Sequence, residues 1–353
     1  MIKLEKLRKA LKSYQVDALL ITNPYNRRYM TGFTGTSGIA IVSENDAVFI
    51  TDFRYTEQAK EQVKHFRIIE QESTILKEVG KQIDKLGIKT LGFEKDTVTY
   101  GKFESFQEQF NAKLVPLSGI IEKIRLIKTN EEINIIKVAC QIADAAFNHI
   151  LDFIKPGVTE LEVSNELEFF MRKQGASSSS FDTIVASGTR SALPHGVATN
   201  KVIEKGDFVT LDFGAIYNGY VSDITRTIAV GTPNPKLIEM YNVVLEAQLL
   251  ALEKVGPGLT GKEADKIARD FLTEKGYGKA FGHSLGHGIG LEIHEGPTLS
   301  YRSDQVLEPN MVVTIEPGVY LPEIGGVRIE DDIVITPTGN EKLTHSKKEL
   351  IIL

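Results

Sequence analysis

One short segment occurs twice in the chain, about a hundred residues apart, and this repeat limits the folds that the sequence can adopt. Pro156-Gly-Val-Thr159 opens the first copy and Pro257-Gly-Leu-Thr260 opens the second. Thr159 forms a capping box with Glu162, which predicts a helix that closes at Gly175. Each copy is followed by a helix, a histidine-containing segment and a hairpin with two acidic residues. The repeat predicts two pseudo-symmetric α+β halves.

Asp212 and Asp223 belong to the first hairpin, whose two-residue turn is predicted at Asn218-Gly219. This turn places Asp212 opposite Thr225. Asp212 and Asp223 then project from the same face as diagonal neighbours, within reach of one shared ion. Two solvated acids on an outer strand face are the alternative. The neighbours of the two acids are apolar, which weakens that alternative: Phe208, Val209, Leu211, Phe213 and Ile224.

Glu316 and Glu330 flank the turn predicted near Ile324-Gly-Gly326 in the second hairpin. Taken alone, they could be paired acids with Arg328 as their counter-charge. A lone histidine is more often a hydrogen-bonded core residue, but three close to an acidic hairpin favour a chemical role. The three histidines between the hairpins are His283, His287 and His294.

Carboxylates on apolar strands cannot stay ionised side by side without a compensating cation. The four acids therefore predict a bound metal, and we expect a pair of ions. Oxygen ligands with one imidazole suit Mn²⁺, Co²⁺, Fe²⁺ or Zn²⁺ rather than a metal that prefers thiolates. Two bridging carboxylates would hold two ions about 3.5–4 Å apart, with a shared hydroxide as the nucleophile.

The N-terminal third of the chain alternates helical and strand patterns, which predicts an α/β layer domain. Leu114-Val-Pro-Leu-Ser-Gly119 is the expected boundary, because proline and glycine interrupt it. A long helix then begins at the capping box Thr129-Asn-Glu-Glu132. We expect domains at residues 1–122 and 123–353. The helices are expected near residues 4–14, 55–64, 73–86 and 101–111, and the strands near 18–21, 39–42, 47–51, 66–70 and 90–93.

The composition narrows the possible partners. A formal net charge of −6 argues against nucleic acid as the main partner. No apolar run approaches the roughly 20 residues needed to cross a bilayer, and the charged N-terminal segment has no signal-type apolar block. The single cysteine, Cys140, is consistent with a reducing compartment and is expected in a helix core. We expect a cytoplasmic protein.

These segments resemble the pita-bread metallopeptidases, the group of methionine aminopeptidase, aminopeptidase P and prolidase. Asn23-Pro-Tyr-Asn-Arg-Arg-Tyr29-Met-Thr-Gly-Phe33 and Thr51-Asp-Phe-Arg-Tyr55 also resemble the creatinase-type N-terminal domain. Methionine aminopeptidases generally lack that domain, so the branch that cleaves Xaa-Pro bonds is the better match. The resemblance covers nearly the whole chain and matches all five metal-ligand positions: Asp212, Asp223, His287, Glu316 and Glu330.

The resemblance implies a role for each of these residues. Asp223 and Glu330 would bridge two divalent ions, with Mn²⁺ expected and Co²⁺ or Zn²⁺ as alternatives. Asp212 would complete one coordination sphere, and His287 with Glu316 the other. Glu316 would also be the general base for the bridging hydroxide. His195 and His294 would be catalytic residues on the substrate side. The residues expected to bind substrate or to fix the acids of the site are His195, His283, His294, Tyr320 and Arg328.

The resemblance leaves two peptidase activities open. A dipeptidase must bind the carboxylate of the product proline, and arginine is its natural partner. Compact prolidases carry an arginine directly after the proline of His294-Glu-Gly-Pro297, where this chain has Thr298. We therefore expect an Xaa-Pro aminopeptidase acting on proline-containing peptides. A prolidase is the alternative if Arg302, or an arginine of a partner subunit, binds the carboxylate.

Two other functions follow from relatives that lack metal ligands: a non-catalytic pita-bread binding protein and a creatinase-like hydrolase. The complete set of ligand residues counts against both. The family also implies a homodimer in which the N-terminal domain contributes to the rim of the partner's active site. Tyr25, Arg27, Arg28 and Arg54-Tyr55 are the residues expected at that contact, because they do not look like core residues.

Overall fold

The computed structural model describes residues 2–353 and divides into two compact units, Met1–Arg125 and Leu126–Leu353. The domain boundary expected after residue 122 falls inside the helix that closes the first unit, Ile120–Arg125. None of the helices in residues 2–353 is both long and apolar enough to cross a membrane.

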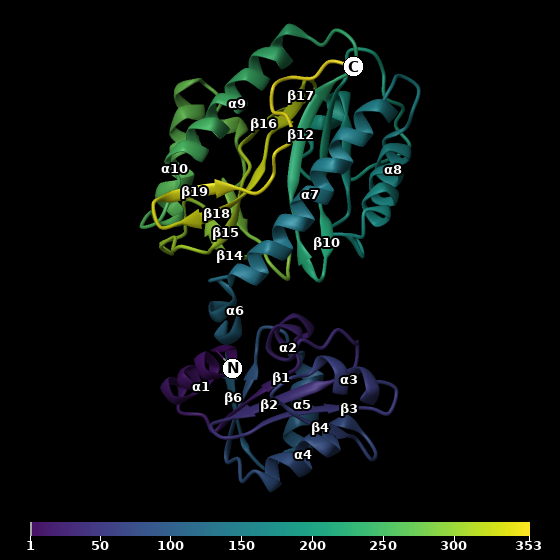
Figure 1. Ribbon diagram of the computed structural model, residues 1–353. Coiled ribbons are helices and arrows are strands. Elements are labelled where there is room, and N and C mark those ends of the chain that lie inside the picture. Colours follow the sequence, from purple (N-terminus) through teal and green to yellow (C-terminus); the bar gives the residue numbers. More distant parts are fainter. Residues whose placement is uncertain (1) are drawn as a thin grey trace. The chain divides into compact units, whose positions relative to one another are not determined.

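The first unit is a six-stranded mixed sheet with helices, as the alternation of patterns predicts (Figure 1). The strand order is β4-β3-β2-β1-β5-β6, with parallel pairs at β3/β4, β1/β5 and β5/β6. Its strands are β1 (Ala18–Ile21), β2 (Ile39–Ser43), β3 (Ala47–Thr51), β4 (Arg67–Glu70), β5 (Thr90–Glu94) and β6 (Lys113–Leu117). Its helices are α1 (Ile2–Tyr14), α2 (Pro24–Thr31), α3 (Thr56–Gln62), α4 (Ile75–Lys85), α5 (Tyr100–Gln109) and α6 (Ile120–Arg125).

Three expectations for this unit are wrong. No helix was expected between the strands near 18–21 and 39–42, but Asn23 caps α2 and Pro24 occupies its first position, where proline is favoured. The segment expected as the domain boundary, 114–119, instead contains β6 of the first unit, whose Pro116 is tolerated because β6 is an edge strand. Arg27 is only 6% exposed and donates to the carbonyls of Gly35 and Gly38, so it does not belong to an exposed cluster.

The second unit consists of two related halves, each with a pair of helices packed against strands. Figure 1 shows α7 and α8 on one side of the strands and α9 and α10 on the other. The helices are α7 (Asn130–Phe153), α8 (Glu160–Lys173), α9 (Pro235–Lys254) and α10 (Gly261–Glu274), with 3₁₀ turns η1 (Gly188–Ala192) and η2 (Gly278–Ala280). Both α8 and α10 begin at a capping box, which is the structural form of the sequence repeat.

The strands of this unit form two hairpin systems that face each other. The sheet β12-β9-β8 belongs to the first half, and the sheet β14-β13-β15-β18-β19 belongs to the second. Each half has its own apolar core between its sheet and its helices. The strands are β7 (Ser178–Ser179), β8 (Ile184–Ser187), β9 (Phe208–Phe213), β10 (Ala215–Tyr217), β11 (Tyr220–Val221), β12 (Ile224–Ala229), β13 (Gly286–Gly288), β14 (Glu295–Leu299), β15 (Val312–Ile315), β16 (Gly318–Leu321), β17 (Gly325–Arg328), β18 (Asp331–Thr336) and β19 (Gly339–Lys342).

The first hairpin has the predicted register. Tyr217 pairs with Tyr220 across the two-residue turn, in which Asn218 and Gly219 both have positive φ. Asp212 therefore lies opposite Thr225, as expected from the sequence. This register places the two aspartates of the hairpin on one face.

Candidate metal centre

A cavity of about 760 Å³ lies between the two halves of the second unit. All five expected metal ligands line it, together with four of the five residues expected on the substrate side. Tyr320 is the exception: it is not among the lining residues, but its hydroxyl accepts a hydrogen bond from Arg328, which is. The lining residues on which the argument depends are His195, Asp212, Asp223, His283, His287, His294, Thr298, Glu316, Arg328 and Glu330.

Interruptions in the strand ladders aim three of the acids at the cavity. Asp223 lies between β11 and β12, Glu316 between β15 and β16, and Glu330 between β17 and β18. At Asp223 and Glu330 the backbone bonds across the two halves, whereas the amide of Glu316 donates to the carbonyl of Leu285 within the second half, at 2.8 Å. The amide of Asp223 donates to Asp332 Oδ2 at 2.8 Å, and the amide of Glu330 donates to the carbonyl of Thr225 at 3.1 Å. The same bonds that join the halves therefore orient Asp223 and Glu330.

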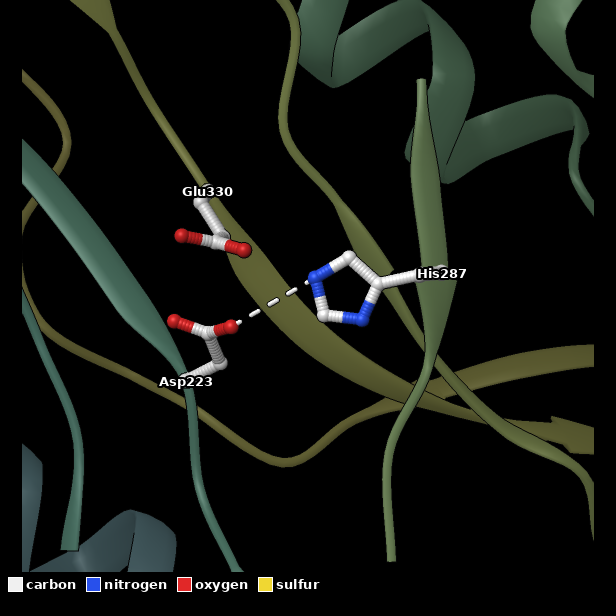
Figure 2. Close-up of side chains that lie close together, drawn as sticks. All are labelled: Asp223, His287 and Glu330. Carbon is white, nitrogen blue, oxygen red and sulfur yellow. Dashed lines mark ion pairs between the residues drawn. The ribbon is translucent and has the colours of Figure 1, made fainter. Parts of the chain in front are cut away.

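His287 lies close enough to two of the acids for the three side chains to bind one ion together. Its Nε2 is 3.6 Å from Asp223 Oδ2 and 3.4 Å from Glu316 Oε1. Asp223, His287 and Glu330 each offer a ligand atom within 4.8 Å of the others, and Figure 2 shows these three side chains converging. His287 lies on strand β13, in a stretch too rich in glycine to form a stable helix.

The electrostatics of this cluster call for added positive charge. Burial raises the pKa of Asp223 and of Glu330 well above the usual carboxyl range, and the neighbouring acids raise it further. Burial also raises the pKa of Glu316. Burial lowers the pKa of His287 to about 4, so its imidazole is neutral near pH 7. Asp212 Oδ1 and Asp223 Oδ1 are buried without a hydrogen-bond partner. Buried acids, a neutral imidazole and orphaned oxygens together fit a divalent cation site.

Arg328 is the cation that the protein itself supplies to this cluster. Its Nη2 donates to Asp212 Oδ2, its Nη1 to the Tyr320 hydroxyl at 2.7 Å and its Nε to Thr225 Oγ1 at 3.1 Å. Thr225 in turn donates to Glu330 Oε2 at 2.6 Å. Arg328 was considered from the sequence as the counter-charge of Glu316 and Glu330, but it bonds directly to Asp212. Its hydrogen bonds connect to Glu330 only through Thr225.

The three remaining histidines of the cavity differ in burial. His283 is bonded to the Tyr320 hydroxyl at 3.0 Å, and burial lowers the pKa of His283 to about 4. His195 and His294 are exposed to the cavity. The ring of His294 packs edge-on against His287, with centroids 4.4 Å apart. His195 and His294 come from different halves, so they face the acids from two loops.

Thr298 and Arg302 differ in their relation to the cavity. Thr298 lines the cavity and pairs with His287 across β13 and β14. Arg302 is exposed, lies over the Tyr301 ring and is not among the lining residues. Within residues 2–353, Arg328 is the one arginine or lysine that lines the cavity.

Two residues that hold the backbone next to the acids, Arg226 and Asp332, were not predicted from the sequence. Arg226 is 1% exposed and donates to the carbonyls of Thr225 and Glu330. Asp332 binds the Asp223 amide and the Cys140 thiol, which adds a polar contact to the expected core cysteine. The sequence did carry a signal for each: Arg226 lies within an apolar strand, and Asp332 is a further acid directly after Glu330-Asp331.

Two family models match the chain. The model of metallopeptidase family M24 matches residues 134–337, and that of the creatinase/prolidase N-terminal domain matches residues 3–127. The first match lies within the second structural unit, and the second match spans nearly all of the first unit and ends two residues past it.

Solved and curated relatives match over almost their full length. An Xaa-Pro dipeptidase structure from Bacillus anthracis is 63% identical, with a TM-score of 0.99, over 100% of this chain and 99% of that one. An Xaa-Pro dipeptidase of Pyrococcus furiosus is 45% identical over 99% of both chains. A structure of the X-Pro aminopeptidase from Thermotoga maritima is 42% identical, with a TM-score of 0.92, over 98% of this chain and 100% of that one.

Proposed function

The chain belongs to metallopeptidase family M24 and is a peptidase of the Xaa-Pro type, and we propose that it removes the N-terminal residue from Xaa-Pro-Yaa peptides. One observation carries the proposal. Two carboxylates and a neutral imidazole converge in a cavity where the four acids proposed as ligands share one basic side chain, Arg328. The creatinase-type domain at the N-terminus supports the Xaa-Pro branch of the family.

Five residues would hold two divalent ions, with Mn²⁺ as the expected metal: Asp212, Asp223, His287, Glu316 and Glu330. When bound, the ions would polarise the scissile carbonyl and lower the pKa of the attacking water. Asp223 and Glu330 are the proposed bridging ligands. The partnerless oxygens of Asp212 and Asp223 support their assignment as ligands.

Side chains of the protein would then transfer the proton and stabilise the developing charge. Glu316 is the proposed general base, which accepts on its carboxylate the proton that the attacking water loses. Its carboxylate lines the cavity 3.4 Å from His287 Nε2, beside the other proposed ligands, where a base for this proton is needed. His195 and His294 are the proposed donors to the tetrahedral oxyanion and the leaving nitrogen, since both are exposed to the cavity.

Arg328, Tyr320 and His283 form a chain of hydrogen bonds that ends on Asp212. We propose that this chain fixes the orientation of Asp212 and shapes the wall of the substrate site. Because Tyr320 reaches the cavity only through its neighbours, its role is to position Arg328.

A metal site suits the Xaa-Pro bond for a chemical reason. This bond is a tertiary amide, so the substrate has no N–H there for a protease to bind. A site that binds the free amino terminus and acts on the carbonyl directly does not need that N–H.

The choice between aminopeptidase and dipeptidase depends on the product carboxylate. A dipeptidase needs a cation free to bind this carboxylate, whereas Arg328 is already bonded to three side chains and Arg302 does not line the cavity. Thr298 cannot replace a guanidinium. The alternative, an Xaa-Pro dipeptidase, is favoured by the names of two close relatives, and an arginine from a partner subunit of a homodimer would supply the cation.

The decisive experiment compares kcat/KM for a dipeptide such as Ala-Pro with that for the matching tripeptide Ala-Pro-Ala. The proposal predicts that the tripeptide is the better substrate. A dipeptide preference above about tenfold, corresponding to about 1.4 kcal/mol of transition-state binding, would establish the alternative. Loss of that preference in Arg302→Ala would identify Arg302 as the source of the cation.

A further inference from the structure

A buried carboxylate lies beneath the loop that carries His195. Glu160 is the first residue of α8 and is 0% exposed. Its Oε1 accepts from the amide and the hydroxyl of Ser187, at 2.7 and 2.9 Å. Its Oε2 accepts from the amide and the hydroxyl of Thr199, at 3.1 and 2.8 Å, and from Arg190 Nη1. One carboxylate therefore fastens both ends of the segment 187–199.

The helix itself does not need this carboxylate. Thr159 and Glu162 already form the capping box that satisfies the start of α8. A buried carboxylate is unfavourable unless charge and hydrogen bonds compensate it, and all five donors to Glu160 come from the loop. The arrangement orders the loop rather than the helix.

The loop in turn determines where His195 lies. Arg190 donates a second bond, from Nη2 to the carbonyl of Val197 at 2.9 Å, and the Val197 amide donates to the carbonyl of His195. No hydrogen bond to the His195 ring is found among the residues that the structure describes. The ring is therefore placed in the cavity by its backbone, and that backbone is held through Glu160.

The other half of the unit repeats the arrangement around His294. Glu295 Oε1 accepts from the amides of Leu291 and Glu292, at 2.7 and 3.0 Å. Its Oε2 lies 3.4 Å from Lys128 Nζ, and both side chains are almost fully buried. His195 and His294 thus each belong to a loop that a buried carboxylate and a basic side chain hold in place.

We propose that Glu160, with Arg190, is a positioning residue that holds the 187–199 loop so that His195 faces the substrate. The proposal rests on the function proposed for His195. Glu160 would act through His195 alone, so its effect on catalysis should depend on whether His195 is present.

A double-mutant cycle tests this dependence. Glu160→Gln keeps the size of the side chain but turns an amide towards the donors of the loop. We expect kcat on an Xaa-Pro-Yaa peptide to fall about 10²-fold, with metal content unchanged, because a small misplacement of a catalytic group has an effect of this size. In a His195→Ala background the same substitution should lower kcat by no more than about threefold, because the two changes remove one effect. Equal effects in both backgrounds would overturn the proposal.

Glu168→Gln is the matched control. Glu168 lies on the same helix in an exposed ion pair with Arg172, so its loss should leave kcat within about twofold of the unmodified protein. Arg190→Met is the second variant if Glu160→Gln does not fold. Arg190→Met keeps the Glu160 carboxylate, so its loss of kcat should be smaller. That loss should again depend on the presence of His195. Independence of Arg190 and His195 would count against the proposal.

Hydrogen exchange gives a reading that does not depend on activity. The amides of Ser187 and Thr199 should exchange faster in Glu160→Gln than in Glu168→Gln. Unchanged protection would refute the positioning role. A metal-loaded protein that cleaves no Xaa-Pro peptide would refute the proposed function, whereas the exchange result would still decide whether Glu160 orders the loop.

Discussion

Replacing Arg328 with methionine would test whether the acid cluster depends on the protein's own cation. The Arg328 side chain is 4% exposed and makes three side-chain hydrogen bonds, to Thr225, Tyr320 and Asp212. Methionine has a similar length, so the change removes charge and hydrogen bonds more than volume. Asp212 Oδ1 already lacks a partner, and the substitution removes the partner of Oδ2 as well.

The expected loss follows from leaving a buried carboxylate alone. Removing one partner of a buried ion pair typically costs about 3–5 kcal/mol. In a unit of this size, such a loss lowers the unfolding midpoint by roughly 10 °C. The loss should be largest in metal-free protein and smaller with Mn²⁺ present, because bound ions supply the missing positive charge.

The assay is thermal and urea unfolding of both proteins, with a chelator and with Mn²⁺. Arg302→Met is the control, since Arg302 is exposed and away from the cavity lining; its effect should stay within about 0.5 kcal/mol. If the two metal-free variants unfold within about 1 kcal/mol of each other, the account of Arg328 as the cluster's counter-charge is refuted.

Three further predictions concern the acids and the cavity histidines. Asp223→Ala or Glu330→Ala should lose metal and activity together, measured by elemental analysis beside hydrolysis, whereas metal retention would contradict bridging. His195→Ala and His294→Ala should keep their metal while kcat falls about 10²–10³-fold; a variant that fails to bind metal would show that its histidine is misassigned. Burial raises the folded-state pKa of Asp223, Glu316 and Glu330, so protonation stabilises the metal-free fold fully only below their unfolded pKa values near 4. This contribution is lost as pH rises through the raised folded-state values, which for Glu316 is about 8. The unfolding midpoint of metal-free protein, relative to that of metal-loaded protein, should fall over this range, and a constant difference would argue against the raised pKa values.

Local chemistry made much of the fold predictable. The Asn218-Gly219 turn has one favoured geometry, so it fixed the register of the first hairpin and the pairing of Asp212 with Thr225. The capping box at Thr159 marked the start of α8 correctly. Helix α2 was missed because the Asn23-Pro24 pair is common both in turns and at helix starts.

Contacts between distant segments were not predictable in this way. The sequence places Arg328 two residues from Glu330, yet its direct carboxylate partner is Asp212, more than a hundred residues away. Glu160 resembles any acidic residue in the first turn of a helix, and its five donors come from a loop without periodicity. Such relations depend on how the strands and loops pack.

Titration of metal-free protein with Mn²⁺ tests the central claim most directly. Hydrolysis of an Xaa-Pro-Yaa peptide would be followed together with the metal bound per chain. We predict no activity without metal and a plateau near two ions per chain, the number that the five ligand residues would hold. Full activity in metal-free protein would contradict the account.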